Sequence, residues 1–224
     1  MLRVIFELFL DLSPKKKFYL LILVLMMTYI KSIVLLISLL TLFACEKTYV
    51  PKPRGYHRID LPDHEYQMLT ENHPFTFKYS KYAEVKKHTS SISEAHWIDI
   101  VYPAHKAVIQ LTYKDLSKDK LTNAREKFLN ELVNDSYKLT SKHQVKAYAI
   151  DESTIKTPSG KSATVFELEG DVPSQFQFYI TDTTHHFLRG ALYFRTSTKN
   201  DSLKPVIEYI KIDMMELLNS LEWK

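Results

Sequence analysis

Glycine is scarce in this chain of 224 residues, which contains only Gly55, Gly160, Gly170 and Gly190. No two of these glycines lie within nine residues of each other. Nucleotide-binding loops of the Gly-x-Gly-x-x-Gly and Walker types need closely spaced glycines, because the backbone must approach a phosphate group. The sequence therefore argues against nucleotide-binding folds that depend on such loops.

Cysteine occurs once, as Cys45. A single cysteine allows neither an intramolecular disulfide nor a metal site with several cysteine ligands. A free thiol in an exported domain is open to oxidation, and a lipid attached to the sulfur removes that hazard. The lone cysteine therefore favours a lipid-modified position over a structural one.

Signatures of common catalytic sites are also missing. The chain has no Gly-x-Ser-x-Gly turn and no His-Glu-x-x-His helix, and a lipid-bearing Cys45 leaves no cysteine to act as a nucleophile. Together these absences predict a protein that is not an enzyme and that has no catalytic residue, bound metal or cofactor.

The net charge of +4 comes mostly from the start of the chain, because residues 1–44 hold five basic and two acidic side chains. The remaining residues include 25 basic and 24 acidic ones, so this part is almost neutral. Nucleic-acid binding needs a clustered excess of cationic side chains. The sequence therefore predicts no nucleic-acid partner.

A long apolar run extends from Phe18 to Ala44 and contains one charged residue, Lys31. It is long enough to cross a membrane, so a signal anchor retained in the bilayer is one interpretation. The part of the run that follows Met26 and Met27 is by itself a complete short signal, with a basic start and an apolar stretch. We hypothesise that translation begins at Met26 or Met27.

The end of this run favours removal of the segment over retention. The three residues before Cys45 match the lipobox that bacterial lipoprotein signal peptidase reads: Leu42, Phe43 and Ala44. A small residue at the cleavage site lets the extended backbone enter the protease groove. We therefore predict that residues 1–44 are a lipoprotein signal segment and that Cys45 is the lipid-bearing first residue of the mature protein.

Residues 45–70 are predicted to form a tether. They contain Pro51, Pro53 and Pro62, and proline fixes φ and removes a hydrogen-bond donor, which favours an extended chain. We expect this tether to hold a single domain, residues 71–224, away from the membrane.

Alternation of apolar and polar residues predicts several strands in this domain. They cover residues 75–79, 97–102, 107–113, 145–150, 163–169, 175–181 and 187–195. The clearest one-sided patterns are Ala107, Ile109, Leu111 and Tyr113 in one strand, Phe176, Phe178 and Ile180 in another, and Leu188, Leu192 and Phe194 in the last.

Two helices are predicted as well. One covers residues 119–141 with Asp119 as its cap, and the other is a terminal helix capped by Asp201 or Ser202, with Pro205 in its first turn. The terminal helix has an apolar stripe at helical spacing: Leu203, Val206, Ile207, Ile210, Met214, Leu217, Leu218 and Leu221. Together the elements predict an α+β fold, an antiparallel β-sheet flanked by helices, which loosely resembles the PsbP-like sandwich.

Polar residues with possible chemical roles gather between residues 181 and 189. His185 and His186 are adjacent, so they point to opposite faces of an extended chain and do not readily share one metal, although Asp182 and one histidine offer two ligands. In a structural interpretation, Asp182 instead holds a turn by local hydrogen bonds.

Arg189 lies in the middle of an otherwise apolar strand. Either it binds a carboxylate or phosphate of a ligand, or it pairs with a carboxylate of the chain such as Asp182. The alternative to a non-enzymatic protein is therefore a small-ligand-binding or hydrolytic domain centred on Asp182, His186 and Arg189.

Several tyrosines lie in or near the tether. Aromatic side chains often anchor protein interfaces, so we hypothesise that these residues form an interaction surface: Tyr49, Tyr56, Tyr66, Tyr79 and Tyr82.

Two long motifs are recognisable in the mature chain. The first reads Pro-Lys-Pro-Arg-Gly-Tyr at 51–56 and His-Arg-Ile-Asp-Leu-Pro at 57–62. The second includes Thr-Asp-Thr at 181–183, His-Phe-Leu-Arg-Gly-Ala-Leu-Tyr-Phe at 186–194, and the closing Leu-Glu-Trp-Lys at 221–224. These motifs resemble the gliding-motility lipoprotein GldD family. The resemblance covers essentially all of residues 45–224 and is weakest between residues 117 and 144.

This resemblance implies a non-enzymatic, lipid-anchored component of the cell-surface gliding machinery, which is linked to type IX protein secretion. It implies that other gliding-motility lipoproteins and envelope proteins are the partners, and it supplies no cofactor or catalytic residue. Six motif residues are candidates for a partner surface: Arg54, Tyr56, Arg58, Asp182, His186 and Arg189.

The residues after Cys45 bear on location. Glu46 is followed at once by Lys47, without the acidic run expected of a surface-exported lipoprotein, which favours the periplasmic face of the outer membrane. One acyl chain anchors a protein weakly, so we expect Cys45 to carry more than one chain, palmitate among them.

Overall fold

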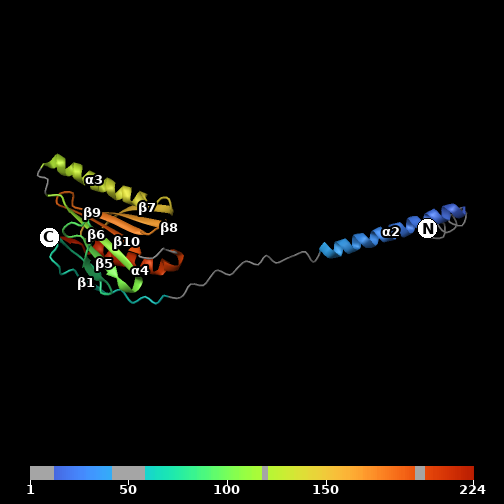
Figure 1. The fold of residues 1–224 in the computed structure, drawn as a ribbon, viewed down its shortest axis with the longest axis horizontal. Helices are drawn as coiled ribbons and strands as arrows, with labels where there is room; N and C mark the ends of the chain where they lie inside the picture. The colour runs from blue at the N-terminus through green and yellow to red at the C-terminus, as the bar shows by residue number, and fades with distance from the viewer. Residues whose placement is uncertain (1–12, 42–58, 118–120, 195–199) are drawn as a thin grey trace. The chain divides into compact units, whose positions relative to one another are not determined.

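The computed structural model describes residues 13–41, 59–117, 121–194 and 200–224, and the chain divides into two units, Met1–Gly55 and Tyr56–Lys224. The first unit contains helix α2 (Pro14–Thr41; Figure 1). Within it, Leu21–Ser38 is long and apolar enough to cross a membrane, and none of this stretch is buried. A signal segment and a retained anchor both fit such a helix. Cys45 and the lipobox residues 42–44 lie outside the described residues.

The second unit is built on a seven-stranded antiparallel sheet. Across the sheet, the strands are β4 (Glu84–Lys87), β5 (Ile98–Tyr102), β6 (Ala107–Asp115), β10 (His186–Phe194), β9 (Phe176–Thr181), β8 (Ser162–Gly170) and β7 (Ala147–Lys156). Strands β4 to β6 form one meander and β7 to β10 form another. The two meet where β10 pairs with β6, from His186 opposite Asp115 to Phe194 opposite Ala107.

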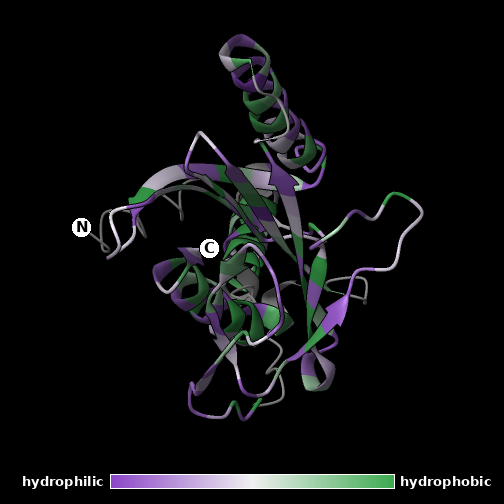
Figure 2. Ribbon diagram, turned by 90° about the vertical axis from the view of Figure 1, so that its left-hand side faces the viewer, coloured by the Kyte–Doolittle hydropathy of each residue, from purple (hydrophilic) through white to green (hydrophobic). Residues whose placement is uncertain are grey.

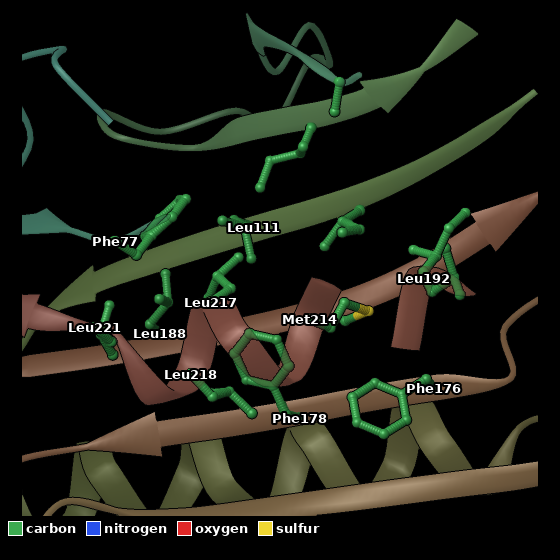
Figure 3. Close-up of a cluster of buried hydrophobic side chains, with 14 of the residues drawn as sticks. Phe77, Leu111, Phe176, Phe178, Leu188, Leu192, Met214, Leu217, Leu218 and Leu221 are labelled. Carbon is green, nitrogen blue, oxygen red and sulfur yellow. The ribbon is translucent and has the colours of Figure 1, made fainter. Parts of the chain in front are cut away.

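One face of the sheet packs against helix α4 (Asn200–Asn219). Figure 3 shows side chains of α4 and the turn after it, such as Met214 and Leu217, lying against inward-facing residues of the sheet, such as Leu111 and Phe178. All four of these side chains are at most 1% exposed. The main core therefore lies between the terminal helix and this face of the sheet.

Helix α3 (Thr122–Ser141) covers part of the opposite face. The Tyr137 ring contacts the rings of Phe166 on β8 and Tyr179 on β9, and these two residues face away from the main core. In Figure 2, α3 projects at the top of the view, with purple and green residues interspersed along it. Two helices thus flank an antiparallel sheet, which confirms the predicted α+β class.

Two small sheets close the end of the core. Strand β1 (Tyr66–Met68) pairs with β3 (Lys78–Ser80), and β2 (Phe75–Thr76) pairs with β11 (Glu222–Trp223) at the end of the chain. In addition, the Lys224 amide donates to the Pro74 carbonyl oxygen over 2.9 Å. The last residues of the chain are therefore fixed to the first strands of the domain.

The one-sided patterns predicted from the sequence are confirmed. The inward-facing residues of β6, β9 and β10 are buried, and so is the stripe of α4 apart from the half-buried Leu203. The hairpin between β5 and β6 forms through the short 3₁₀ helix η1 (Pro103–His105), with Lys106 in a left-handed conformation at φ 52°.

Several predicted boundaries are wrong. Helix α3 begins at Thr122, and its cap position is Leu121, which makes no side-chain cap; Asp119 lies outside the described residues. Helix α4 begins at Asn200, so Pro205 lies inside the helix and beyond its first turn. The shifts are of one to three residues, and helix ends are the part of an element that a local pattern fixes least well.

Two strand predictions also need correction. Strand β7 is displaced and longer than the predicted 145–150, because the Ala147 amide still bonds the His143 carbonyl and the ladder with β8 continues to Lys156. The predicted strand 75–79 is interrupted after Thr76, and the Lys78 amide there donates to the Ser220 hydroxyl over 2.8 Å.

The predicted tether of residues 45–70 overlaps the folded domain. Ile59 and Leu61 pack against the main core, and β1 lies in one of the small sheets. Burial of these apolar side chains holds the segment on the domain, so the folded part of the chain extends to residues before 71.

Candidate functional site

The turn between β9 and β10 is organised by Asp182. Its Oδ1 atom accepts the backbone N–H groups of Thr184, His185 and His186, at 3.0, 2.8 and 2.8 Å. Partial burial alone would raise the pKa of this carboxyl, but the three backbone donors outweigh it and lower the pKa. Thr183 has a left-handed backbone at φ 66°. Asp182 therefore holds the turn, in agreement with the structural interpretation of its role.

His186 lies at the start of β10 and packs inward. Its Nδ1 atom is 2.8 Å from the Tyr113 hydroxyl, and its ring stacks on Trp223 with centroids 4.9 Å apart. Burial lowers the pKa of His186, and it raises the pKa of Tyr113 to about 12. The histidine thus joins β6, β10 and the last strand β11.

Arg189 points to the opposite face of the same strand, because side chains alternate along a strand and His186 is three residues away. Its Nη2 atom donates to the Gln177 Oε1 atom over 2.6 Å, and the Thr140 hydroxyl of α3 lies 3.3 Å from the same oxygen. Burial lowers the pKa of Arg189. Within the described ranges no carboxylate is recorded in an ion pair with Arg189, so the alternative in which Arg189 pairs with a carboxylate such as Asp182 is not what the structure has; its partner is Gln177.

The three residues of the alternative site therefore do not converge. Asp182 is used by backbone amides of its turn, His186 faces the main core, and Arg189 lies under α3 on the other face of the sheet. No shared pocket is available to them, and no group of three or more His, Cys, Asp and Glu residues able to hold a metal exists within the described ranges.

A different polar cluster fixes the start of the domain to α4. His64 Nδ1 lies 2.7 Å from Asp213 Oδ1, and the Tyr102 hydroxyl donates to Asp213 Oδ2 over 2.9 Å. The His64 ring stacks on Tyr209 with centroids 4.3 Å apart. The Asp213 side chain is 1% exposed and the His64 side chain 28% exposed, so this contact is partly reachable from solvent at its histidine end.

Gly190 is the position of the long motif that tolerates no side chain. A Cβ atom on it would lie 2.4 Å from two ring atoms of Phe178 and 3.0 Å from a methyl group of Leu111. The glycine on β10 lets the neighbouring strands β6 and β9 carry Leu111 and Phe178 at the same level of the core.

The family model described as gliding motility lipoprotein GldD matches residues 46–223. The chain belongs to the GldD family. The match begins directly after Cys45 and includes both motifs except Lys224, so it confirms the resemblance stated from the sequence.

Comparisons outside this family are distant. No curated protein matches the chain. The chain is similar to the solution structure of cyanobacterial PsbP (CyanoP) from Synechocystis sp. PCC 6803, with 10% sequence identity and a TM-score of 0.40. That similarity covers 75% of this chain and 98% of the cyanobacterial one.

The structure describes only residues 59–62 of the first motif. Arg54, Tyr56 and Arg58 lie outside the described residues, as does Tyr49. Of the remaining tyrosines of the hypothesised aromatic surface, Tyr66 stacks on His64, Tyr79 packs against the main core, and Tyr82 is 44% exposed. The last two residues of the first motif, Leu61 and Pro62, come shortly before His64 of the polar cluster in the chain.

Sequence analysis missed His64 and Asp213. One signal was present: Asp213 lies three residues after Ile210 and four before Leu217, so it falls on the apolar face of the terminal helix. An acidic residue on a buried stripe needs a partner. No comparable signal identifies His64, because its approach to Asp213 depends on how the segment before β1 folds back.

Proposed function

We propose that this chain is a lipid-anchored component of the gliding-motility machinery that assists the assembly or stability of the gliding and type IX secretion apparatus through protein contacts. The observation that carries the proposal is the GldD family match from residue 46, immediately after the lone cysteine. A lipid on Cys45 confines the domain to a membrane and raises its effective concentration near membrane-bound partners.

The role is non-enzymatic in this proposal. The motif residues with the most reactive side chains serve the fold: Asp182 holds a turn and His186 joins three strands. We place the domain at the periplasmic face of the outer membrane, with more than one acyl chain on Cys45, since one chain alone gives marginal binding. Other gliding-motility lipoproteins and envelope proteins are the proposed partners.

The test is to express the full chain in a gliding bacterium with Cys45→Ala, and with Glu46→Ala as the matched control. Cells are fed a clickable palmitate analogue, membranes are separated on a density gradient, and colony spreading is measured. We expect the wild type and Glu46→Ala to take the label, to sediment with the outer membrane and to spread.

Cys45→Ala is expected to lose the label and spreading together. If the wild type takes no label, the apolar segment is a retained helix and the lipoprotein assignment fails. If Cys45→Ala loses the label but spreads normally, the anchor has no role in gliding and the proposed function fails.

A further inference from the structure

The two edges of the seven-stranded sheet differ in how they are protected. Strand β4, at one edge, has four residues and includes Lys86 and Lys87. Short edge strands with lysines resist pairing with other chains. Strand β7, at the other edge, has ten residues, and within the described ranges it pairs only with β8. The sheet thus has one protected edge and one long open edge.

The side chains of β7 are mostly exposed. Tyr148 is 78% exposed, and few side-chain contacts hold the strand. Ala147 and Ile150 pack against a small cluster around Phe166, Ile155 packs against the main core, and the Glu152 carboxylate accepts the Tyr137 hydroxyl of α3. The Ala147 amide at the start of the strand is bonded to the His143 carbonyl, so the open part of this edge begins after the irregularity between Ala147 and Ala149.

The direction of the β7 backbone groups follows from the ladder. The Leu168 amide donates to the Gln175 carbonyl, away from β7, and Leu168 is opposite Ile150. In an antiparallel pair such a position is not hydrogen-bonded, so the N–H and C=O groups of Ile150 point outward from the sheet. By alternation the same holds for Glu152 and Thr154.

The opposite end of the strand agrees with this assignment. The Thr157 amide donates to the Lys161 carbonyl of the following turn over 2.8 Å. Odd-numbered residues at this end therefore bond inward and even-numbered ones face outward. The backbone groups of three alternate residues, Ile150, Glu152 and Thr154, therefore face outward, which is enough for a short antiparallel ladder with another strand.

Charge indicates what kind of strand fits there. Asp151 and Glu152 lie at the centre of β7, Lys146 precedes the strand and Lys156 is its last residue. A second copy of β7 paired antiparallel about its centre would place acidic residues opposite acidic residues, and like charges directly opposite each other are destabilising. A segment with basic residues at its centre would be complementary.

We infer that β7 is a docking edge that receives an extended segment of another envelope protein, with basic side chains at the centre of that segment, as an added strand. This inference rests on the proposed function, since it names the surface through which the protein contacts would form.

The test uses the full chain in a gliding host. A photoreactive phenylalanine derivative replaces Tyr148 at the β7 edge, and the same derivative replaces Lys86 at the β4 edge as the matched control. The crosslinked peptide is identified by mass spectrometry. We expect an adduct from position 148 and not from position 86, to a segment of one envelope protein that contains lysine or arginine.

Thr154→Pro then removes an outward N–H without removing a bond to β8, and edge strands tolerate proline at such positions. Thr154→Ala is its control. We expect Thr154→Pro to lower the adduct yield at least about tenfold, in line with the free energy of a lost hydrogen bond and a blocked ladder. Thr154→Ala should leave the yield within about twofold.

Thermal unfolding of both variants checks the fold. If Thr154→Pro unfolds, Asp151→Lys replaces it, since it reverses the charge of an exposed side chain at the centre of β7 and keeps Glu152, whose carboxylate accepts the Tyr137 hydroxyl of α3, and a lower adduct yield is expected. The inference is overturned by an adduct of two copies of this chain, by no excess over position 86, or by a yield that neither variant lowers. The Cys45→Ala variant tests the proposed function separately. The proposed function stands if Cys45→Ala fails to spread while the control Glu46→Ala spreads.

Discussion

His64 and Asp213 form a direct polar contact between the start of the domain and its terminal helix, with 2.7 Å between Nδ1 and Oδ1. The carboxylate is buried, and its second oxygen accepts the Tyr102 hydroxyl of β5. One acidic side chain thus holds together the segment before β1, the sheet and α4. This arrangement explains why an acidic residue occupies the apolar face of that helix.

We expect Asp213→Ala to lower the free energy of unfolding by about 3 kcal/mol, because it leaves His64 and Tyr102 without their shared acceptor. Asp213→Asn, which keeps one acceptor, should cost less. Glu216→Gln on the same helix breaks only a partly exposed pair with Lys78 and should change stability by less than about 1 kcal/mol. Denaturant unfolding of the three variants measures this, and equal costs for Asp213→Ala and Glu216→Gln would contradict it.

Gly190→Ala should destabilise the domain by about 2 kcal/mol, the usual cost of overpacking a tight core. The added methyl group would meet the Phe178 ring at 2.4 Å. In a Phe178→Leu background the same substitution should cost less than about 1 kcal/mol, because the ring atoms that it meets are gone. Thermal and denaturant unfolding of the double-mutant cycle test this coupling, and additive costs would disprove the steric explanation.

Stability should fall as the pH drops below about 6.5, the usual pKa of histidine. Burial lowers the pKa of His186, so the unfolded chain binds a proton at a higher pH than the folded domain does. The stabilisation is complete above the unfolded pKa and is lost as the pH falls through the folded pKa. Burial lowers the pKa values of His96, His105 and His143 as well, and these residues act in the same direction.

Melting temperatures of the wild type and His186→Gln between pH 8 and 5 check this. Glutamine keeps a polar group near Tyr113 and removes the titration, so the variant should lose less stability on acidification. His185→Gln is the matched control, since the His185 side chain is 61% exposed. If His185→Gln flattens the pH profile as much as His186→Gln does, the assignment to His186 is wrong.

The sequence predicted those elements whose own side chains determine their burial. The alternation in β6 and β9 and the stripe from Val206 to Leu221 agree with the buried positions. Strands β1 and β4 escaped prediction because they are short and largely polar, and they are strands only through pairing with β3 and β5. Pairing between distant segments leaves little trace in a local pattern.

The candidate residues show the same division. The role of Asp182 could be predicted, because an Asx turn involves only residues within four positions of it. The partner of Arg189 could not, since Gln177 reaches it through the register of β9 on β10. The role of His64 depends on its contact with Asp213, about 150 positions away in the chain, and a local sequence pattern does not predict so distant a contact.

The pairing of β11 with β2 has a consequence for the order of synthesis and export. The terminal helix provides much of the main core, and the last strand closes it against residues near the beginning of the domain. These elements are synthesised after the strands of the large sheet, so the core face of that sheet has no helix to pack against until α4 and β11 have emerged. A domain that stays open until then is suited to being threaded across a membrane before it folds.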